Sequence, residues 1–324
     1  MSHNNISINA ICRFFVKNND YVVFVHENPD ADAIGSACAL VATLRAIGKR
    51  AHVVSYDKIP NSLTFLTDGI RDFSFDALPR DFTPGVYVST DVASPGQLGG
   101  YRDYASKVSL SLDHHATHDR FAEMTFIDPM AAACAEIVYR IVNRLLIGEL
   151  SKETASMLYA ALAADTGGFR YANTTQYTHK IAARLIELGA DHTQICHNLF
   201  ECKSKAALAA EAFAMANVMY RCDGLIATVR ITLADKARYG FEDEDTYDVI
   251  NAIRRADGVK IAIFAREREP GQYKISTRSA CEIDVAKICA IFGGGGHPGA
   301  AGCSVSENEL DSAVETIIKE CGFQ

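Results

Sequence analysis

The sequence predicts an α/β protein with two domains: a parallel sheet with helices on both faces, connected by a helix to a smaller α/β domain. Three observations predict this fold. The 324 residues exceed the usual size of one domain. Short apolar runs alternate with helical patterns, as in βαβ units. A helical stretch without strand signals separates the two parts. The expected boundaries are 1–190, 191–215 and 216–324.

The first part carries four apolar runs that read as buried parallel strands, the clearest being YVVFV at 21–25. Helical spacing follows between and after them, and Gly48 is suited to end the first helix. The predicted strands are 21–25, 51–56, 86–90 and 108–112, and the predicted helices are 33–47, 132–146 and 152–164.

The connecting segment 191–215 has no Pro/Gly/Ser cluster, so we expect a helix there rather than a flexible linker. The residues beyond it again mix both patterns. The predicted strands of the second part are 225–231, 259–264 and 273–276, and its predicted helices are 285–291 and 307–320.

Composition narrows the class of protein and its partners. The chain is 48% hydrophobic and 22% charged, which is typical of a soluble globular protein. Its formal net charge of −8 argues against a long basic track for nucleic acid, because such a track must neutralise phosphates. The ten cysteines form no CxxC pair, and no apolar run approaches the ~20 residues of a membrane span. We therefore expect a cytoplasmic protein with reduced thiols and no membrane partner.

Aspartate and histidine gather directly after predicted apolar segments at four places. The segment 26–32 (HENPDAD) follows the first strand, and Asp91 follows the third. The triplet 113–115 (DHH) follows the fourth strand, and Asp165 ends the helical stretch 152–164. Since ligand sites of open α/β sheets lie at the carboxyl ends of the strands, these groups should converge.

A cluster of this composition predicts a metal site. Crowded carboxylates repel one another unless cations neutralise them. Imidazole and carboxylate ligands without CxxC pairs favour an ion such as Mn²⁺ or Mg²⁺ over structural zinc. Any single patch is explained as well by a turn or a helix cap, and Asp30 or Asp32 could cap the helix near Ala33. Four patches in the same register favour the metal site.

These motifs resemble those of the DHH phosphoesterase superfamily. The triplet Asp113-His114-His115 matches its namesake motif, and the segment from His26 to Ser36 (HENPDADAIGS) matches its first motif. The resemblance covers nearly the whole chain and implies two divalent cations, with Mn²⁺ preferred and Mg²⁺ or Co²⁺ as alternatives.

The resemblance also implies a role for each residue of the cluster. His26 and Asp30 would hold one cation, while Asp32, His114 and Asp165 would hold the other. Asp91 would bridge the two cations. His115 would face the phosphate as a charge stabiliser or proton donor, and Asp113 would orient the histidines.

A second group of candidate residues lies in the run GGGGHPGAAG at 293–302, whose backbone could approach an anion closely. A flexible surface loop explains the run equally well on composition alone. The preceding Arg278-Ser279 makes the order similar to the substrate-binding domain that accompanies DHH domains. That resemblance implies that the substrate's phosphate and nucleotide are bound by Arg278, Ser279, Gly293, Gly294, Gly295, Gly296 and His297.

Within the superfamily, the length and the glycine-rich segment favour the group of bifunctional oligoribonucleases (nanoRNases) and pAp phosphatases. The expected substrates are short oligonucleotides and small phosphorylated nucleotides, including 3′-phosphoadenosine 5′-phosphate (pAp). The alternatives are a soluble phosphodiesterase of cyclic or linear di-adenylate and, in another class, a nucleotide-binding regulatory module without catalysis. A homodimer and the roles of Arg170, Asn173 and His118 stay open at this point.

Overall fold

The computed structural model describes residues 5–67, 70 and 73–323, and the chain divides into two compact units, Met1–Cys202 and Lys203–Gln324. The first unit contains a five-stranded, all-parallel sheet in the order β2-β1-β3-β4-β5. The strands are β1 (Tyr21–Phe24), β2 (Ala51–Val54), β3 (Val86–Thr90), β4 (Val108–Asp113) and β5 (Met124–Ile127). The four predicted strands are confirmed, and β5 extends the sheet beyond them.

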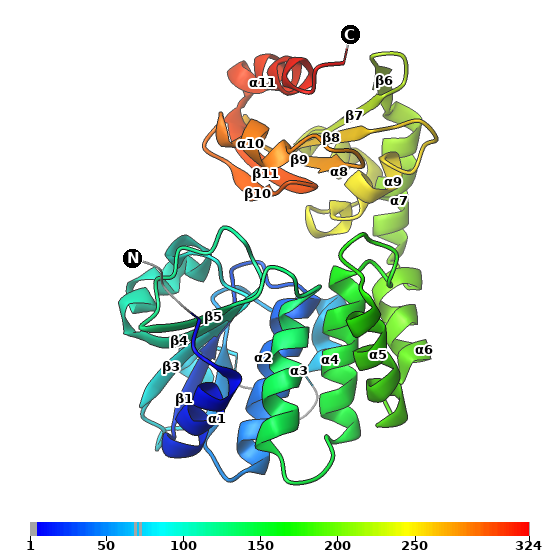
Figure 1. The fold of residues 1–324 in the computed structure, drawn as a ribbon. Helices are drawn as coiled ribbons and strands as arrows, with labels where there is room; N and C mark the ends of the chain where they lie inside the picture. Colours follow the sequence, from blue (N-terminus) through cyan, green and yellow to red (C-terminus); the bar gives the residue numbers. More distant parts are fainter. Residues whose placement is uncertain (1–4, 68–69, 71–72, 324) are drawn as a thin grey trace. The chain divides into compact units, whose positions relative to one another are not determined.

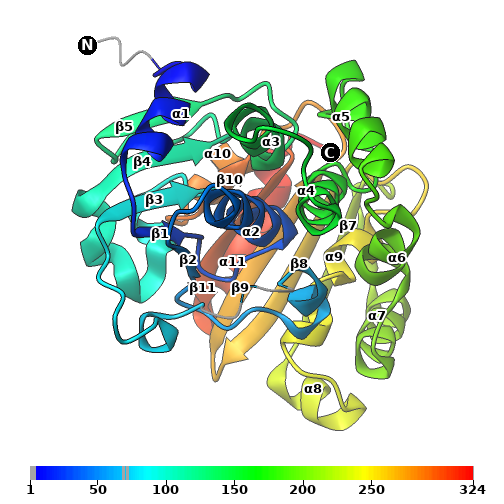
Figure 2. The ribbon, with the colours of Figure 1, turned by 90° about the horizontal axis from the view of Figure 1, so that it is seen from below.

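Helices cover both faces of this sheet, as predicted, with α-helices on one face and 3-10 helices on the other. One face packs against α1 (Ile8–Lys17), α2 (Ala31–Ala46) and α3 (Cys134–Leu145), with Tyr21 and Val23 of β1 in that core. The next helix, α4 (Lys152–Asp165), packs on α2 and α3, and the three lie side by side in Figures 1 and 2.

The other face is covered by 3-10 segments and an aromatic cluster. It packs against η2 (Phe75–Ala77) and η3 (Pro95–Lys107), with Val22 and Phe24 of β1 pointing into that core. The short segment η1 (Asn61–Leu66) lies elsewhere, against α2 and α4. Alternate residues of β1 therefore serve two different cores, which explains why its sequence is apolar throughout.

The helix predicted from residue 33 begins two residues earlier. Asp30 caps it, because its Oδ1 accepts hydrogen bonds from the backbone N–H groups of Asp32 and Ala33, both at 3.0 Å. Of the two aspartates considered as caps, Asp30 has this role, while Asp32 lies inside the first turn. The capping geometry supplies acceptors for two N–H groups that otherwise lack a helical partner.

The prediction of a single helix across 191–215 was wrong. The segment contains α6 (His192–Cys196), the π-helical turn η4 (His197–Glu201) and then α7, which begins at Lys205 and ends at Asn217. Ser204 starts a new helix, since its Oγ accepts the N–H of Ala207 at 2.9 Å. The two compact units meet in the sequence at this break, between Cys202 and Lys203. The helix α5 (Gln176–Glu187) precedes α6.

The second unit contains a mixed six-stranded sheet in the order β10-β11-β9-β8-β7-β6. Only the pair β7 and β8 is parallel, and the remaining pairs are antiparallel. The strands are β6 (Met219–Arg221), β7 (Ile226–Ile231), β8 (Ile261–Glu269), β9 (Gln272–Ser279), β10 (Gly295–His297) and β11 (Ala300–Ser306).

Two small cores lie on opposite faces of this sheet. Ile261 and Ile263 of β8 pack with α10 (Val285–Ala290) and α11 (Glu307–Glu320), and Figure 1 shows α11 over that face. Ala262 and Phe264 pack on the other side with residues of α7 and of α9 (Val249–Ile253). The remaining elements are α8 (Leu233–Tyr239) and η5 (Glu244–Thr246). No helix in the described ranges is long and apolar enough to cross a membrane.

Candidate metal centre

The aspartates and histidines predicted from the strand ends converge in the first unit. Their ligand atoms form three overlapping groups, and the atoms of each group lie within 4.8 Å of one another. The groups are His26, Asp30 and Asp91; Asp32, His114 and Asp165; and Asp91, Asp113, His114 and His115. The structure thus brings together all eight residues that the sequence placed at this edge.

His26 presents its Nε2 atom to two carboxylates. Its Nδ1 lies 2.7 Å from the carbonyl oxygen of Glu27, which can only accept, so Nδ1 carries the proton. Nε2 lies 3.7 Å from Asp30 Oδ1 and 3.6 Å from Asp91 Oδ2. A neighbouring backbone carbonyl therefore selects the tautomer whose lone pair on Nε2 can bind a cation.

His114 in the second group also has its tautomer selected by a backbone carbonyl. Its Nδ1 lies 3.3 Å from the carbonyl oxygen of Ala131, and its Nε2 lies 3.5 Å from Asp91 Oδ1 and 3.3 Å from Asp165 Oδ2. Asp32 Oδ2 is slightly farther from Nε2, at 3.9 Å. Separations of 3.3 to 3.9 Å suit neighbouring ligand atoms of one ion, since Mg²⁺, for example, lies about 2.0–2.1 Å from each of its ligands.

Asp91 lies between the two histidines. Its Oδ2 faces His26 and its Oδ1 faces His114, and the residue is 2% exposed. Its φ of +58° turns the chain sharply after β3, while its N–H donates to the carbonyl oxygen of Leu112 at 2.9 Å. Asp91 is the residue that belongs to both the His26 group and the DHH group.

Asp32 is a structural acceptor as well as a member of the cluster. Its Oδ2 accepts the N–H of Cys134 at 2.6 Å, and its Oδ1 accepts the N–H of Ala135 at 3.0 Å and the hydroxyl of Ser36 at 2.9 Å. The carboxylate of α2 thereby caps the N-terminus of α3, where backbone N–H groups favour a negative charge.

His115 is held by Asp113. Its Nδ1–H donates to Asp113 Oδ1 at 2.7 Å, and the same oxygen accepts the N–H of His114 at 2.7 Å. Burial lowers the pKa of His115, but the carboxylates of Asp113 and Asp91 more than offset this and the pKa is raised. The pair fixes the imidazole in one orientation beside Asp91.

The buried carboxylates of the cluster repel one another. Burial, together with the neighbouring carboxylates of Asp91 and Asp30, raises the pKa of Asp32 well above its usual value. Burial and the nearby aspartates likewise raise the pKa of Asp165. For His26, burial lowers the pKa, but Asp30 and Asp91 outweigh it and raise the pKa well above its usual value. Nearby cations would relieve this repulsion.

Two atoms test whether divalent cations fit these residues. Asp91 Oδ1 and Asp113 Oδ2 are buried oxygens that accept no hydrogen bond. Buried polar atoms normally have a partner, and a cation would provide one for Asp91 Oδ1. The donor set of carboxylate oxygens and imidazole nitrogens suits Mn²⁺ or Mg²⁺, so the residues fit the expected ions.

Three residues whose roles the sequence left open make hydrogen bonds close to the cluster. His118 lies with Nε2 2.9 Å from the Ser111 hydroxyl, and its Nδ1 accepts the N–H of Arg120. Asn173 donates to the carbonyl oxygens of Ala132 and Asp165, at 2.9 and 3.1 Å. Arg170 donates through Nε to the carbonyl oxygen of Gly167. Each of these contacts steadies a loop next to a ligand.

Sequence reasoning missed Gln97, which joins two of these loops. Its side-chain oxygen accepts the N–H of Ala93 at 2.6 Å, and its backbone oxygen accepts the N–H of Glu27 at 2.6 Å. Gln97 therefore links the turn after Asp91 to the loop of His26. The pattern Ser94-x-x-Gln97 is a capping-box signature, so it could have been found from the sequence.

In the second unit, the glycine run forms a β-hairpin rather than a flexible loop. Gly295 pairs with Gly302, and His297 pairs with Ala300, which in turn pairs with Arg278 on β9. A Cβ at Gly294 would lie 2.6 Å from the Cβ of Cys303, so that position needs glycine for close packing. Arg278 and Ser279 on β9 therefore lie one strand away from the hairpin of β10 and β11 that contains the glycine run.

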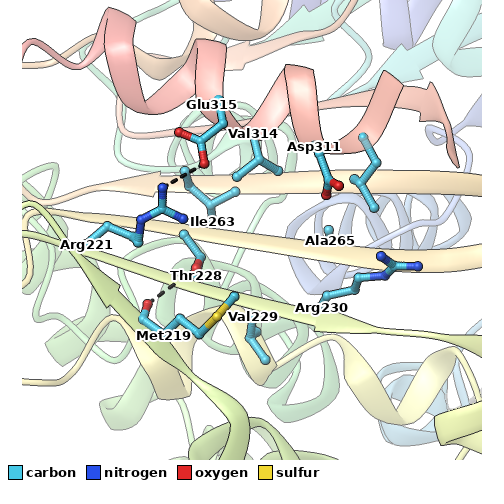
Figure 3. A pocket seen from close by; sticks show the side chains of 11 residues that line it. Met219, Arg221, Thr228, Val229, Arg230, Ile263, Ala265, Asp311, Val314 and Glu315 are labelled. Carbon is cyan, nitrogen blue, oxygen red and sulfur yellow. Dashed lines mark hydrogen bonds and ion pairs between the residues drawn. The ribbon is translucent and has the colours of Figure 1, made fainter. Parts of the chain in front are cut away.

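A separate cavity of about 140 Å³ lies between α11 and strands β6 to β8 of the second unit (Figure 3). Met219, Ile263 and Val314 line it, and Arg221 pairs with Glu315 across it at 2.7 Å. None of the residues predicted to bind substrate lines this cavity, and it lies away from the β10 edge.

Comparison with known proteins identifies the family. Residues 20–162 match the DHH family N-terminal domain, and residues 225–322 match the DHHA1 domain. The chain belongs to the DHH family. It is 31% identical over 299 residues to the bifunctional oligoribonuclease and PAP phosphatase NrnA of Thermus thermophilus, covering 92% of this chain and 87% of that protein.

Two further comparisons agree with the family. NrnA of Bacillus subtilis, of the same description, is 27% identical over 302 residues, which are 91% of this DHH protein and 93% of the relative. The crystal structure of an exopolyphosphatase-related protein from Bacteroides fragilis matches with a TM-score of 0.86 at 23% identity, covering 97% and 94% of the two chains. The latter similarity establishes the fold.

Proposed function

We propose that this DHH protein is a metal-dependent phosphoesterase that hydrolyses short oligoribonucleotides to mononucleotides and removes the 3′-phosphate of pAp. The observation that carries the proposal is the position of Asp91, whose two oxygens face His26 and His114 separately. A single carboxylate between two ligand groups suits a pair of neighbouring cations. The activities are those named for the relatives of Thermus and Bacillus.

Two cations, which we propose to be Mn²⁺, would be held by His26, Asp30, Asp32, Asp91, His114 and Asp165. When bound, such cations supply Lewis-acid stabilisation of phosphate charge and lower the pKa of water. The protein's own contribution is to fix the ligand atoms: Glu27 and Ala131 select the tautomers of the two histidines, and Asp32 is held by the first turn of α3.

His115 is the proposed group that meets the phosphate. Its Nδ1–H is engaged by Asp113, so Nε2 is the atom that would donate a hydrogen bond or proton to a phosphate oxygen or leaving group. Asp113 favours the imidazolium, which keeps a positive charge available beside the phosphate.

In the second unit, we propose that Arg278, Ser279 and the segment from Gly293 to His297 bind the substrate's terminal phosphate and nucleotide. Arg278 lies in register with Ala300, next to the hairpin that contains the glycines. A guanidinium can hold two phosphate oxygens at once, and the glycine backbone admits a close approach.

The test uses purified protein, stripped of metal and reloaded with Mn²⁺, and measures kcat/KM for pAp, for RNA of two to about ten nucleotides, and for cyclic and linear di-adenylate. We expect activity on pAp and the shortest RNAs, a decline with length, and loss of activity in excess EDTA. Full turnover after metal stripping would contradict the metal requirement. Efficiency that rises with length would favour a processive nuclease, and a preference for cyclic di-adenylate would favour a phosphodiesterase of that nucleotide.

The substrate-binding residues are tested with Arg278→Ala, matched by Arg221→Ala at the opposite edge of the same sheet. We expect Arg278→Ala to raise KM for the short substrates, and to lower kcat as well if the residue positions the reacting phosphate. Arg221 pairs with Glu315 on the surface, so its replacement should leave both constants unchanged. Equal effects of the two variants would argue against the proposed role of Arg278.

A further inference from the structure

An exposed tyrosine next to the metal-binding loops is held in a fixed orientation. Tyr56 follows β2 at the carboxyl end of the parallel sheet, and 54% of its surface is exposed. Exposed aromatic rings on loops are usually free to rotate, but this ring is packed on one side. Contacts with neighbouring residues hold the ring in place.

Two consecutive glycines, Gly99 and Gly100, lie against this ring, and we call their backbone its seat. A Cβ at Gly99 would lie 2.7 Å from Tyr56 Cδ1, and a Cβ at Gly100 would overlap the opposite side of the ring, at Cδ2, Cε2 and Cζ. Atoms along both edges of the Tyr56 ring therefore lie close to backbone that carries no Cβ. Tyr101 adds an edge contact, with ring centroids 5.5 Å apart and an interplanar angle of 86°. The backbone of Gly99 and Gly100 and the ring of Tyr101 together fix the orientation of the Tyr56 ring.

Hydrogen bonds connect this seat to the loop that carries His26 and Asp30. The N–H of Asn28 donates to Oδ2 of Asp57 at 2.7 Å, and Asp57 directly follows Tyr56 in the sequence. The N–H of Glu27 donates to the carbonyl oxygen of Gln97 at 2.6 Å, two residues before Gly99. Both the ring and its seat are thus attached to the residues between two proposed metal ligands.

We propose that Tyr56 stacks on the nucleobase of the substrate nucleotide whose phosphate reacts at the metal centre. This inference rests on the proposed function. A rigid aromatic ring loses little conformational entropy when a base stacks on it. Stacking also tolerates any base, which suits an enzyme that degrades RNA of mixed sequence.

The role predicts a dependence on the base. Removing the ring by Tyr56→Ala should lower kcat/KM for pAp about 5- to 150-fold, the usual range for loss of one stacked base. The loss should be smaller for the corresponding uridine bisphosphate, because a pyrimidine offers less stacking surface. It should vanish for ribose 3′,5′-bisphosphate, which has no base. Tyr56→Phe keeps the ring and should retain wild-type values.

The seat provides a second, independent test. Gly100 does not have a positive φ, so Gly100→Ala is compatible with the backbone and acts through its collision with the ring. It should reproduce the base-dependent loss of Tyr56→Ala while leaving the tyrosine in the chain. Gly96→Ala, in the same segment, meets nothing closer than 3.8 Å and should have no effect.

Tyr220→Ala is the control for loss of an exposed tyrosine, since Tyr220 is 49% exposed on β6 of the second unit. Thermal unfolding of every variant checks that the fold is intact. A loss in Tyr56→Ala that is equal for pAp and ribose 3′,5′-bisphosphate, or no loss at all, would overturn the inference. Inactivity of the wild-type protein on every nucleotide would instead refute the proposed function, so the two failures are distinguishable.

Discussion

The carboxylate of Asp32 accepts the backbone N–H of Cys134 at 2.6 Å, which joins the first turn of α2 to the first turn of α3. The same carboxylate lies among the proposed ligands of a cation. Asp32 thus differs from Asp91, whose Oδ1 accepts no hydrogen bond. Hydrogen bonds from the backbone of α3 thus hold one aspartate of the cluster, and the other has an oxygen left for the proposed ion.

This difference predicts that Asp32→Asn lowers the stability of the metal-free protein and that Asp91→Asn does not. Asp32→Asn puts an amide NH₂ where one of the α3 N–H groups now donates, and an unsatisfied buried donor destabilises by about 1–3 kcal/mol. Asp91→Asn removes repulsion toward Asp32 and Asp165 together with attraction toward His26 and His115, so its stability should stay close to that of the wild type. Chemical denaturation of both variants in EDTA measures the difference, and equal stabilities would contradict it.

Activity should depend on Asp91 far more than on another aspartate at the same sheet edge. Asn tolerates the positive φ of this position, so Asp91→Asn should fold and yet lose at least about 100-fold in kcat, as when a group that stabilises transition-state charge is removed. Asp128 follows β5 but pairs with Arg140 at 2.9 Å and belongs to none of the ligand groups. Asp128→Asn should therefore keep near-normal kcat. A near-normal kcat of Asp91→Asn would show that Asp91 is only a loop residue.

The metal-free protein should become less stable as the pH rises from about 4 to above 6.5, the ordinary pKa values of Asp and His. The pKa values of Asp32 and Asp165 are raised, by burial first and then by neighbouring carboxylates, so ionising them at higher pH opposes folding. The raised pKa of His26 acts in the same direction, because its stabilising charge is lost as the pH passes the folded-state pKa.

Mn²⁺ should reverse this trend, since ligands bind the ion in their deprotonated forms and affinity increases with pH. Melting temperatures measured from pH 4.5 to 8.5, in EDTA and in Mn²⁺, check both directions. A metal-free protein whose melting temperature rises steadily over this range would show that the cluster does not carry the proposed repulsion.

Close packing of α2 on α4 should be sensitive to one methyl group. A Cβ at Gly35 would lie 2.5 Å from the carbonyl oxygen of Met157 and 2.9 Å from the Cβ of Ala161. Alanine gains about 1 kcal/mol in helix propensity, but overpacking against backbone costs about 1–3 kcal/mol, so Gly35→Ala should be neutral to destabilising. It should also lower activity, because α2 and α4 carry Asp32 and Asp165. Gly96→Ala is the control, and a stabilised, fully active Gly35→Ala would refute the argument.

Much of the fold was predictable from local patterns. The clearest strand of the first unit is the run YVVFV, which is apolar throughout because both faces of a parallel sheet are buried. The polar groups that follow these runs converge because parallel strands end at one edge. Helix α2 could also be placed, since Asp30 has the side chain of a cap at the right position.

Other features depend on contacts between residues far apart in the sequence. The helix expected across 191–215 is divided, because Ser204 caps a new helix that packs in the second unit. Gly295 and Gly296 of the glycine run lie in the hairpin strand β10, because β11 pairs with them, and Cys303 packs against the preceding Gly294. Local propensity does not contain these interactions, so the sequence pattern alone left a helix and a loop as reasonable predictions.

The sequence by itself determined which residues gather at the candidate metal centre, because residue type and strand-end position are both local properties. The tertiary structure decided how each residue acts there. The carbonyl oxygens of Glu27 and Ala131 select the tautomers of His26 and His114. The N-terminus of α3 holds Asp32, and the backbone of Gly99 and Gly100 fixes Tyr56. Hydrogen bonds and close contacts of this kind exist only after distant segments have packed together, because each partner is supplied by another element.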